Sequence, residues 1–265
     1  MDPITYDSIG IGYNSTRKAD PYITTRLLHL LEPQADKVYL DLGCGTGNYT
    51  IALADRGFDF YGVEPSEKML FEAQLRNTRV KWIQGNAEEI PIQDNLFDGA
   101  IATLTIHHWE DLQKSLSEIN RVLLKNGKIV FFTSTPEQMD GYWLNHYFPK
   151  MLCSSKLKMP SLEAINKAMT LTNFEVLTVE KYFIKDALQD HFLYVGKDKS
   201  ELYLDKRMRR GISSFSALSN SEEVEEGLSR LKSDIETKTF EGIQKQYQNE
   251  LGDYLFIVAK KKGSL

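Results

Sequence analysis

The sequence predicts an α/β protein built on a parallel, doubly wound β-sheet. Between residues 37 and 133, short apolar segments alternate with amphipathic segments five times, which is the pattern of successive β-α-β units. Within the first unit, three glycines at alternate positions separate the strand from the helix. Two more apolar segments, one starting at Phe174 and one near the C-terminus, add strands to the sheet.

The elements follow in order along the chain. A helix over 21–31 is expected from its apolar stripe, and Pro33 ends it. Ser161 is a candidate cap for a helix that Asn173 would end. The residues 124–128 are expected to form a turn, and 141–148 an aromatic helix. Strands are expected at 38–42, 58–63, 80–83, 97–103, 129–133, 174–184 and 252–260.

The segment between the last two strands is too long for a simple hairpin loop. Residues 185–251 connect them, and a loop of that length without its own structure is uncommon. Asn220 and Glu223 resemble a capping box ahead of an apolar helical face. We therefore expect an N-terminal segment (1–36), a core (37–184 and 252–265) and a mainly helical cap (185–251).

Composition narrows the function. The 265 residues carry a formal net charge of −5, whereas nucleic-acid-binding proteins usually show a basic balance. The start, Met1 to Ile4, has no basic and apolar pattern of a signal peptide, and no apolar run reaches membrane-spanning length. The two cysteines, Cys44 and Cys153, indicate no disulfide framework. The expectation is a cytoplasmic protein, monomeric or homodimeric, without nucleic-acid or membrane partners.

The glycine-rich turn is the expected ligand-binding element. Glycine allows positive φ angles and lets a ligand lie against the backbone, and the following helix begins with free N–H groups. The dinucleotide pattern G-x-G-x-x-G fails, because Asn48 or Thr50 stands at its sixth position. The pattern of the NTPase phosphate loop is absent.

The run Asp41-x-Gly43-x-Gly45-x-Gly47 resembles the cofactor loop of the class I S-adenosylmethionine (SAM)-dependent methyltransferases. The closest resemblance is to the broad group that includes the quinone-biosynthesis and trans-aconitate methyltransferases. It extends motif by motif over 13–133, and beyond that only by element order. It implies a Rossmann-like sheet of seven strands with an antiparallel C-terminal strand, SAM as cofactor and S-adenosylhomocysteine as product. No metal is expected from the residues themselves: His107 and Asp111 could share a helical face, but the sequence offers no third ligand nearby.

Further motifs extend the expected cofactor site. Glu64 ends the second strand, where an acid can accept from both ribose hydroxyls; a helix-capping role near Ser66 is the alternative. Residues 85–91 resemble the family's adenine-binding element, with Asn86 in place of its usual acid. The resemblance implies cofactor contacts from Tyr13, Arg17, Asp41, Gly43, Cys44, Gly45, Gly47, Asn48, Glu64, Pro65, Met69, Asn86, Ala87, Glu88, Thr103 and Leu104, with Tyr13 and Arg17 near the methionine carboxylate.

The acceptor side is less defined by the sequence. His107 and His108 follow the fourth strand and are candidate general bases, although either could cap a helix or shape the pocket wall instead. Tyr142, Trp143, Arg207 and Arg210 are candidate substrate-binding residues. Their alternatives are core packing for the aromatic residues and plain surface positions for the arginines.

Together these observations predict a methyltransferase that transfers a methyl group from SAM to an O, N or C atom of a small molecule. Two alternatives stay open at this point. One is a SAM-binding protein without methyl transfer, because cofactor motifs report binding and not chemistry. The other is a different nucleotide-dependent Rossmann enzyme, such as a dehydrogenase, against which the failed dinucleotide pattern counts.

Overall fold

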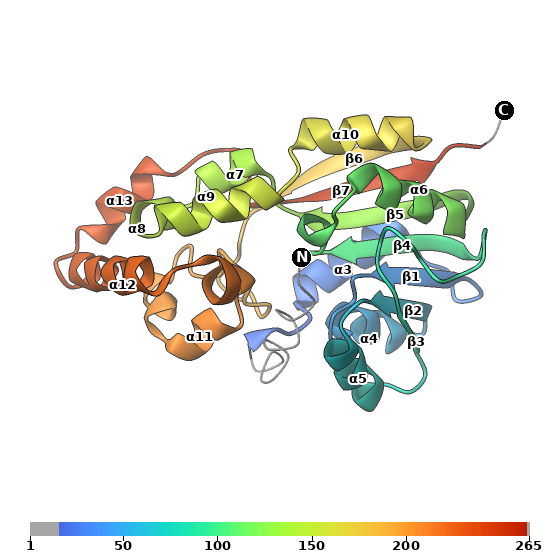
Figure 1. Ribbon diagram of the computed structural model, residues 1–265, viewed down its shortest axis with the longest axis horizontal. Coiled ribbons are helices and arrows are strands. Elements are labelled where there is room, and N and C mark those ends of the chain that lie inside the picture. Colours follow the sequence, from blue (N-terminus) through green and yellow to red (C-terminus); the bar gives the residue numbers. More distant parts are fainter. Residues whose placement is uncertain (1–15, 264–265) are drawn as a thin grey trace.

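The computed structural model describes residues 16–263 and contains the predicted sheet (Figure 1). Its seven strands lie in the order β3-β2-β1-β4-β5-β7-β6, with β1 to β5 parallel and β7 antiparallel to both of its neighbours. The fold class and the antiparallel C-terminal strand are thus confirmed. The strands are β1 (Val38–Leu42), β2 (Asp59–Glu64), β3 (Lys81–Gln84), β4 (Phe97–Thr103), β5 (Leu123–Thr133), β6 (Phe174–Tyr182) and β7 (Tyr254–Lys261).

Helices cover both faces of the sheet. Along β5, Ile129 and Phe131 pack into one apolar cluster while Val130 and Phe132 pack into the other, as expected for side chains that alternate across a buried strand. One face carries α3 (Pro21–Leu31), α4 (Asn48–Ala54) and α5 (Glu67–Arg76); the other carries α6 (Leu112–Val122) and α10 (Leu162–Leu171).

Local sequence explains where most of these helices begin. The side chains of Asp20, Ser66, Asp111 and Ser161 accept from the backbone N–H groups of the first turns of α3, α5, α6 and α10, which satisfies donors that a helix leaves unpaired. At the other end of α10, Asn173 adopts a positive φ of 63°, as predicted for a residue that terminates a helix.

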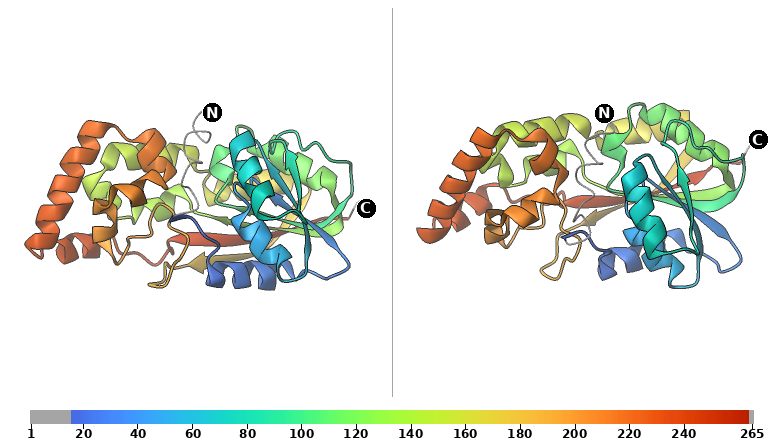
Figure 2. Two further views of the ribbon diagram at one scale, coloured as in Figure 1. Left: turned by 90° about the horizontal axis from the view of Figure 1, so that it is seen from below. Right: turned by 60° about the horizontal axis from the view of Figure 1, so that its bottom comes forward.

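The remaining helices form a lobe beyond the carboxyl ends of the strands (Figures 1 and 2). The expected helical insertion is present, but the lobe also includes residues 136–158, which the sequence assigned to the core. Contacts between α8 and α12 and between α9 and η3 join the two segments. The lobe contains α7 (Pro136–Asp140), α8 (Leu144–Tyr147), α9 (Pro149–Lys158), η2 (Ser200–Leu204), α11 (Lys206–Arg210), η3 (Ser214–Leu218), α12 (Ser221–Glu236) and α13 (Phe240–Gln246).

One acidic side chain ties the two parts of the lobe together. Asn220 caps α12 by accepting from the backbone N–H of Glu223, as predicted. The Glu223 carboxylate does not complete the capping box; it accepts from the N–H groups of Lys150 and Met151 at 2.6 and 3.1 Å. It therefore caps α9, which has no side-chain cap of its own.

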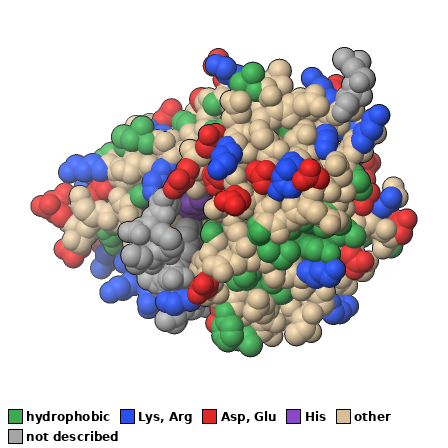
Figure 3. All heavy atoms as spheres, turned by 45° about the vertical axis from the view of Figure 1, so that its right-hand side comes forward, with side chains coloured by type: hydrophobic (Ala, Val, Ile, Leu, Met, Phe, Trp, Pro, Cys, Tyr) green, Lys and Arg blue, Asp and Glu red, His purple; other side chains and the backbone are tan. Residues whose placement is uncertain are grey.

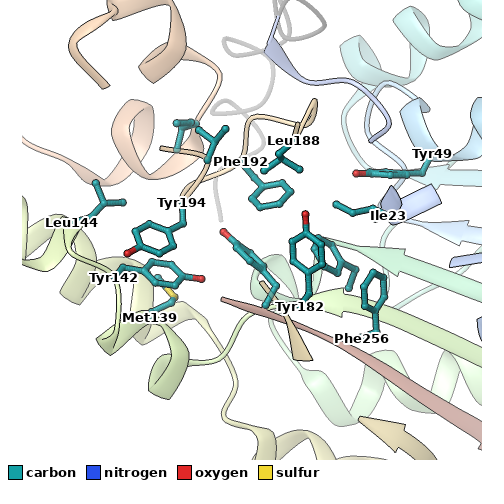
Figure 4. Packing of buried hydrophobic residues seen from close by; sticks show 14 of the residues in the cluster. Ile23, Tyr49, Met139, Tyr142, Leu144, Tyr182, Leu188, Phe192, Tyr194 and Phe256 are labelled. Atoms are coloured by element: carbon teal, nitrogen blue, oxygen red, sulfur yellow. The ribbon is translucent and has the colours of Figure 1, made fainter. Parts of the chain in front are cut away.

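A continuous apolar cluster joins the lobe to the sheet (Figure 4). The rings of Tyr142 and Tyr194 stack with centroids 4.0 Å apart, and Phe192 from the lobe packs against Phe132 and Tyr254 of the sheet. The shared core fixes the lobe over the edge of the sheet where the glycine turn lies.

On the surface, acidic and basic side chains are interspersed over the face shown in Figure 3.

The strand ends differ from the prediction mainly at β5. The sequence predicts a turn over 124–128, whereas β5 already begins at Leu123. Its pairing with β4 shifts register between Phe97 and Gly99, and Asn126 has a φ of 67°. Asn126 thus adopts its turn-like φ angle within an irregular part of a longer strand, and the expected separate turn is not formed.

Candidate cofactor and acceptor site

The three glycines of the turn have different roles. All three have positive φ angles of 72°, 55° and 77° at Gly43, Gly45 and Gly47. A Cβ atom on Gly43 would lie 2.0 Å from the Thr105 hydroxyl, and one on Gly47 would lie 2.4 Å from the Trp82 ring. Gly43 and Gly47 are therefore required by the protein's own packing.

Gly45 faces open space instead. Among the described residues, a Cβ atom there would come within 4 Å only of the Met69 sulfur, at 3.7 Å. The space belongs to a cavity of ≈ 570 Å³ at the carboxyl ends of the strands, where ligands of doubly wound sheets bind. Predicted cofactor residues that line it are Arg17, Asp41, Gly43, Cys44, Gly45, Asn48, Glu64, Pro65, Met69, Asn86, Glu88, Thr103 and Leu104.

Two of the predicted residues do not line the cavity, and a third lies outside the described residues. Gly47 accommodates Trp82, as described above, and is not part of the cavity wall. The side chain of Ala87 is 5% exposed and packs in the core, so a contact from Ala87 to the adenine would come from its backbone N–H, as the resemblance implies. Tyr13 lies outside the described residues.

Two backbone N–H groups hold the Glu64 side chain beside the glycine turn. Its Oε2 accepts from the Gly45 N–H at 2.9 Å and its Oε1 accepts from the Ser66 N–H at 3.0 Å. Burial raises the pKa of this carboxyl above its ordinary value, while the two backbone donors oppose the rise. A carboxylate has about four acceptor positions, so two stay available to a ligand. Ser66 itself caps α5, so the helix does not need Glu64 for that purpose.

Two buried oxygen atoms of the cavity wall have no hydrogen-bond partner among the described residues. They are Asp41 Oδ1 and Thr103 Oγ1. The other Asp41 oxygen accepts from the Thr50 hydroxyl at 2.6 Å. Buried polar atoms are normally paired, so a polar ligand with hydrogen-bond donors fits this wall.

Burial raises the pKa of Asp41 from 3.8 to about 7, and the nearby Glu64 carboxylate adds to the rise. The native protein therefore holds a proton that the unfolded chain releases between those values, and the unfolding free energy falls as pH rises through the window. We expect Asp41→Asn to gain stability relative to the parent from pH 4 to 7, by on the order of 2–4 kcal/mol, and to level off above. Urea unfolding of the ligand-free proteins at several pH values measures this. If the unfolding free energies of the parent and of Asp41→Asn change with pH in parallel from pH 4 to 7, Asp41 does not have the raised pKa.

Asn86 and Glu88 also form hydrogen bonds with neighbouring protein groups. Asn86 Oδ1 accepts from the Glu89 N–H at 2.8 Å, which leaves one of its two lone pairs for a ligand. Glu88 Oε1 accepts from the Glu110 N–H at 2.7 Å and from the Ser115 hydroxyl at 3.2 Å. Glu88 thus fastens the cavity wall to the start of α6.

Arg17 meets an acid that sequence reasoning missed. Its guanidinium forms an ion pair with Asp190, which lies 173 residues away in the cap segment and is 2% exposed. The Tyr49 hydroxyl donates to the same carboxylate at 3.0 Å, and the Arg17 carbonyl accepts from Asn48. Asp190 is one acid among many in its region, and no local motif marks it. Arg17 and Asp190 both line the cofactor cavity.

A smaller cavity of ≈ 80 Å³ adjoins the first one. Arg17, Leu104 and His108 line both cavities, so the two share a wall. The smaller cavity lies between the sheet and the helical lobe. Its other lining residues are His107, Ser134, Met139, Ser155, Lys158, Met159, Phe192, Leu193, Ile212, Ser213, Ser214, Ala217, Leu218 and Tyr254.

The two histidines lie together on the short turn η1 (Ile106–His108), with ring centroids 3.8 Å apart. Burial lowers the pKa of His107 well below its ordinary value, and the His108 and Lys158 charges act in the same direction. Burial, with Lys158, lowers the pKa of His108 to about 4. Both imidazoles are therefore neutral at pH 7. The Nδ1 atom of His107 is buried without a hydrogen-bond partner among residues 16–263.

Comparison with known proteins agrees with this geometry. The family described as "Methyltransferase domain" matches residues 40–131. A solved structure from Anabaena variabilis, named as a methyltransferase from an antibiotic biosynthesis pathway, is 35% identical, covers 92% of this chain and 98% of that chain, and has a TM-score of 0.81. The chain belongs to the class I SAM-dependent methyltransferases.

Curated relatives match over shorter stretches. An uncharacterized methyltransferase of Mycobacterium tuberculosis is 31% identical over 135 residues, which are 51% of this chain and 55% of that protein. A demethylmenaquinone methyltransferase of Oceanobacillus iheyensis is 28% identical over 178 residues, which are 64% of this chain and 73% of that protein. The methyltransferase thus spans only about half the length of the first of these relatives.

The four residues predicted to bind substrate lie elsewhere in the methyltransferase. Tyr142 is 1% exposed and donates to the Asp253 carbonyl at 2.5 Å. Trp143 is fully buried, and its indole N–H donates to the Lys197 carbonyl. Arg207 is exposed and pairs with Asp205, the N-cap of α11, and Arg210 is exposed as well. None of the four lines either cavity, because the aromatic pair forms the core of the lobe and the arginines face solvent.

Two further findings concern the described part of the methyltransferase as a whole. No three His, Cys, Asp or Glu side chains of residues 16–263 come together in an arrangement that could hold a metal ion. Within the same range, every helix is too short or too polar to cross a bilayer.

Proposed function

We propose that the methyltransferase transfers a methyl group from SAM to an O, N or C atom of a small molecule and releases S-adenosylhomocysteine. The observation that carries the proposal is the shared wall of the two cavities. A large cavity lies on the glycine turn, and a small one lies between the sheet and the helical lobe. Leu104 and His108 line both, so a donor and an acceptor would meet there.

The larger cavity offers a partner for each part of the cofactor. Glu64 would accept from the ribose hydroxyls with its two remaining lone pairs. Asn86 and Met69 would contact the adenine, and Gly45 provides the space for a close approach to the backbone. Arg17 would pair with the methionine carboxylate, since a guanidinium is suited to a carboxylate.

When bound, SAM supplies both the activated methyl group and the leaving group. The task of the chain is to hold the acceptor atom in line and to exclude water. Phe192, Leu193 and Ile212 of the lobe line the smaller cavity and would keep it dry. A neutral imidazole of His107 or His108 could take a proton from an acceptor that must lose one.

A small acceptor fits the surface better than a nucleic acid. The net charge is −5, and acidic and basic side chains are interspersed on the face in Figure 3. Nucleic-acid binding usually needs a basic stripe or patch. The small volume of the second cavity also suits a small molecule or the reacting end of one.

The test is turnover of SAM to S-adenosylhomocysteine with a panel of small acceptors, with mass detection of the methylated product. Calorimetry with S-adenosylhomocysteine comes first. Binding together with a methylated product supports the proposal. Absence of binding would refute it. If S-adenosylhomocysteine binds but SAM is turned over neither with the acceptor panel nor with a whole-cell metabolite extract, the result would instead favour a SAM-binding protein.

His107→Asn tests the proton-accepting role. If the acceptor must lose a proton, we expect kcat to fall by about 100-fold or more, with SAM affinity unchanged, because His107 lines only the acceptor cavity. The loss should shrink at high pH, where the acceptor ionises by itself. His146→Asn on α8 is the matched control and should leave kcat unaltered. An unchanged kcat in His107→Asn would exclude His107 as the base and leave either His108 or positioning alone.

The cap should become better protected when the site is filled. Residues 189–191 are held by the Arg17–Asp190 pair, by Gln189 N–H donating to Asp20, and by His191 N–H donating to the Thr16 carbonyl. We expect slower amide hydrogen exchange in this segment and its neighbours after S-adenosylhomocysteine binds. Strands β4 and β5 serve as the internal reference. Equal protection with and without ligand would identify a fixed structural insert.

A further inference from the structure

Lys158 brings a positive charge to the smaller cavity, and no acid among the described lining residues offsets it. Lys158 is the last residue of α9 and lines this cavity between the sheet and the helical lobe. Among the residues 16–263, no acid forms a salt bridge or hydrogen bond with its ammonium group. Its neighbour Lys156, in the same helical turn, pairs with Asp140 at 2.6 Å. The two lysines therefore differ in role, although both lie where cations favour a helix C-terminus.

The rest of the described cavity wall does not neutralise this charge. Of the lining residues, the ionisable ones are Arg17, His107, His108, Lys158 and Tyr254, and the described lining contains no carboxylate. Arg17 has its own acid in Asp190. Both imidazoles are neutral at pH 7, because burial and the nearby Lys158 charge disfavour a second cation. The described lining of the cavity thus carries a positive charge on Lys158, which is partly buried.

The remaining described wall is mostly apolar, but it includes one buried polar atom without a hydrogen-bond partner among the described residues. Leucine, isoleucine, methionine and phenylalanine side chains from the sheet side and from the helical lobe line it. Between them, the buried Nδ1 of His107 has no hydrogen-bond partner among the described residues. A ligand with an apolar body, a negative group and a hydrogen-bonding atom would satisfy all three features.

We propose that the acceptor of this methyltransferase binds as an anion, with its negative group paired to Lys158 and its apolar body between the sheet and the helical lobe. The suitable acceptors are carboxylates, enolates or phenolates of small apolar molecules, and ammonium-bearing acceptors are disfavoured. This inference rests on the proposed function and specifies its acceptor. In the transfer, an electron pair of the acceptor forms the bond to the methyl carbon while the carbon–sulfur bond breaks, and its electrons stay on sulfur as a neutral thioether.

The experiment measures charge preference with S-adenosylhomocysteine-loaded protein. Ligand-observed NMR titrations use shape-matched trios: 4-phenylbutyrate, 4-phenylbutan-1-ol and 4-phenylbutylamine, with corresponding trios on cyclohexyl and short alkyl bodies. We expect the carboxylates to bind about tenfold or more tighter than the alcohols, and the amines to bind weakest. Lys158→Met should abolish the preference and Lys158→Arg should keep it. Lys156→Met is the control and should behave like the parent.

Several results would overturn this inference. They are equal binding of acids and alcohols by the parent, a preference that survives in Lys158→Met, and no carboxylate binding at millimolar concentration. Each leaves the proposed function standing, provided that S-adenosylhomocysteine binds. If S-adenosylhomocysteine itself fails to bind, the proposed function fails first, and the two failures are distinguishable by calorimetry.

Discussion

Gly45→Val is expected to abolish binding of SAM and S-adenosylhomocysteine, with a loss of more than about 100-fold, or about 2.7 kcal/mol. The reason is steric. A side chain at Gly45 would project into the cavity, where only the Met69 sulfur lies within 4 Å among the described residues. A branched side chain would therefore fill space that the cofactor needs. Calorimetry with S-adenosylhomocysteine measures the loss, and Gly45→Ala should give a smaller one.

The control separates this effect from backbone strain. Gly57 also has a positive φ, of 94°, is exposed, and would meet no described atom within 4 Å. Gly57→Val should therefore lower stability through its φ angle but leave cofactor affinity unchanged. If folded Gly45→Val protein binds S-adenosylhomocysteine like the parent, the glycine turn is not the cofactor site.

Glu64→Ala should weaken cofactor binding by about 10- to 100-fold, because hydrogen bonds to a charged group contribute about 1.5–3 kcal/mol. The carboxylate is held by Gly45 and Ser66 at 2.9 and 3.0 Å, so its geometry is set before the ligand arrives. Calorimetry with S-adenosylhomocysteine measures the effect. Glu67→Ala, at the exposed start of α5, is the control and should change little.

A second ligand pair tests whether Glu64 acts on the ribose or only on the turn. The parent should bind adenosine more tightly than 2′,3′-dideoxyadenosine, and Glu64→Ala should lose that preference. If both proteins show the same preference, Glu64 supports the loop and does not read the hydroxyl groups. Such a result would leave the Gly45 prediction intact.

Much of the core could be predicted because its signals are local. The alternation of strands and helices, the cap at Ser161 and the glycine turn each depend on neighbours within a few residues. The cofactor cavity follows from the same logic, since parallel strands bring their carboxyl ends to one edge. Asp41, Glu64 and Thr103 lie at those ends and line one cavity.

The acceptor side could not be predicted in the same way. Tyr142 and Trp143 stood out as aromatic residues, yet burial in the lobe is an equally ordinary fate for such side chains. The structure buries both and hydrogen-bonds them to the backbone. Lys158 and Asp190 carried no motif, and they gain a role only where the chain brings them to the cavities.

By itself, the sequence determined the sheet, the glycine turn and the chemistry of the residues at the strand ends, because periodicity and turn geometry act over short distances. Only the tertiary structure decided which distant residues complete the site. Asp190 of the cap pairs with Arg17, 173 positions away, and Lys158 at the end of α9 lines the same cavity as His107 and His108. Such contacts depend on how two separate lobe segments pack against the sheet, which no local pattern specifies.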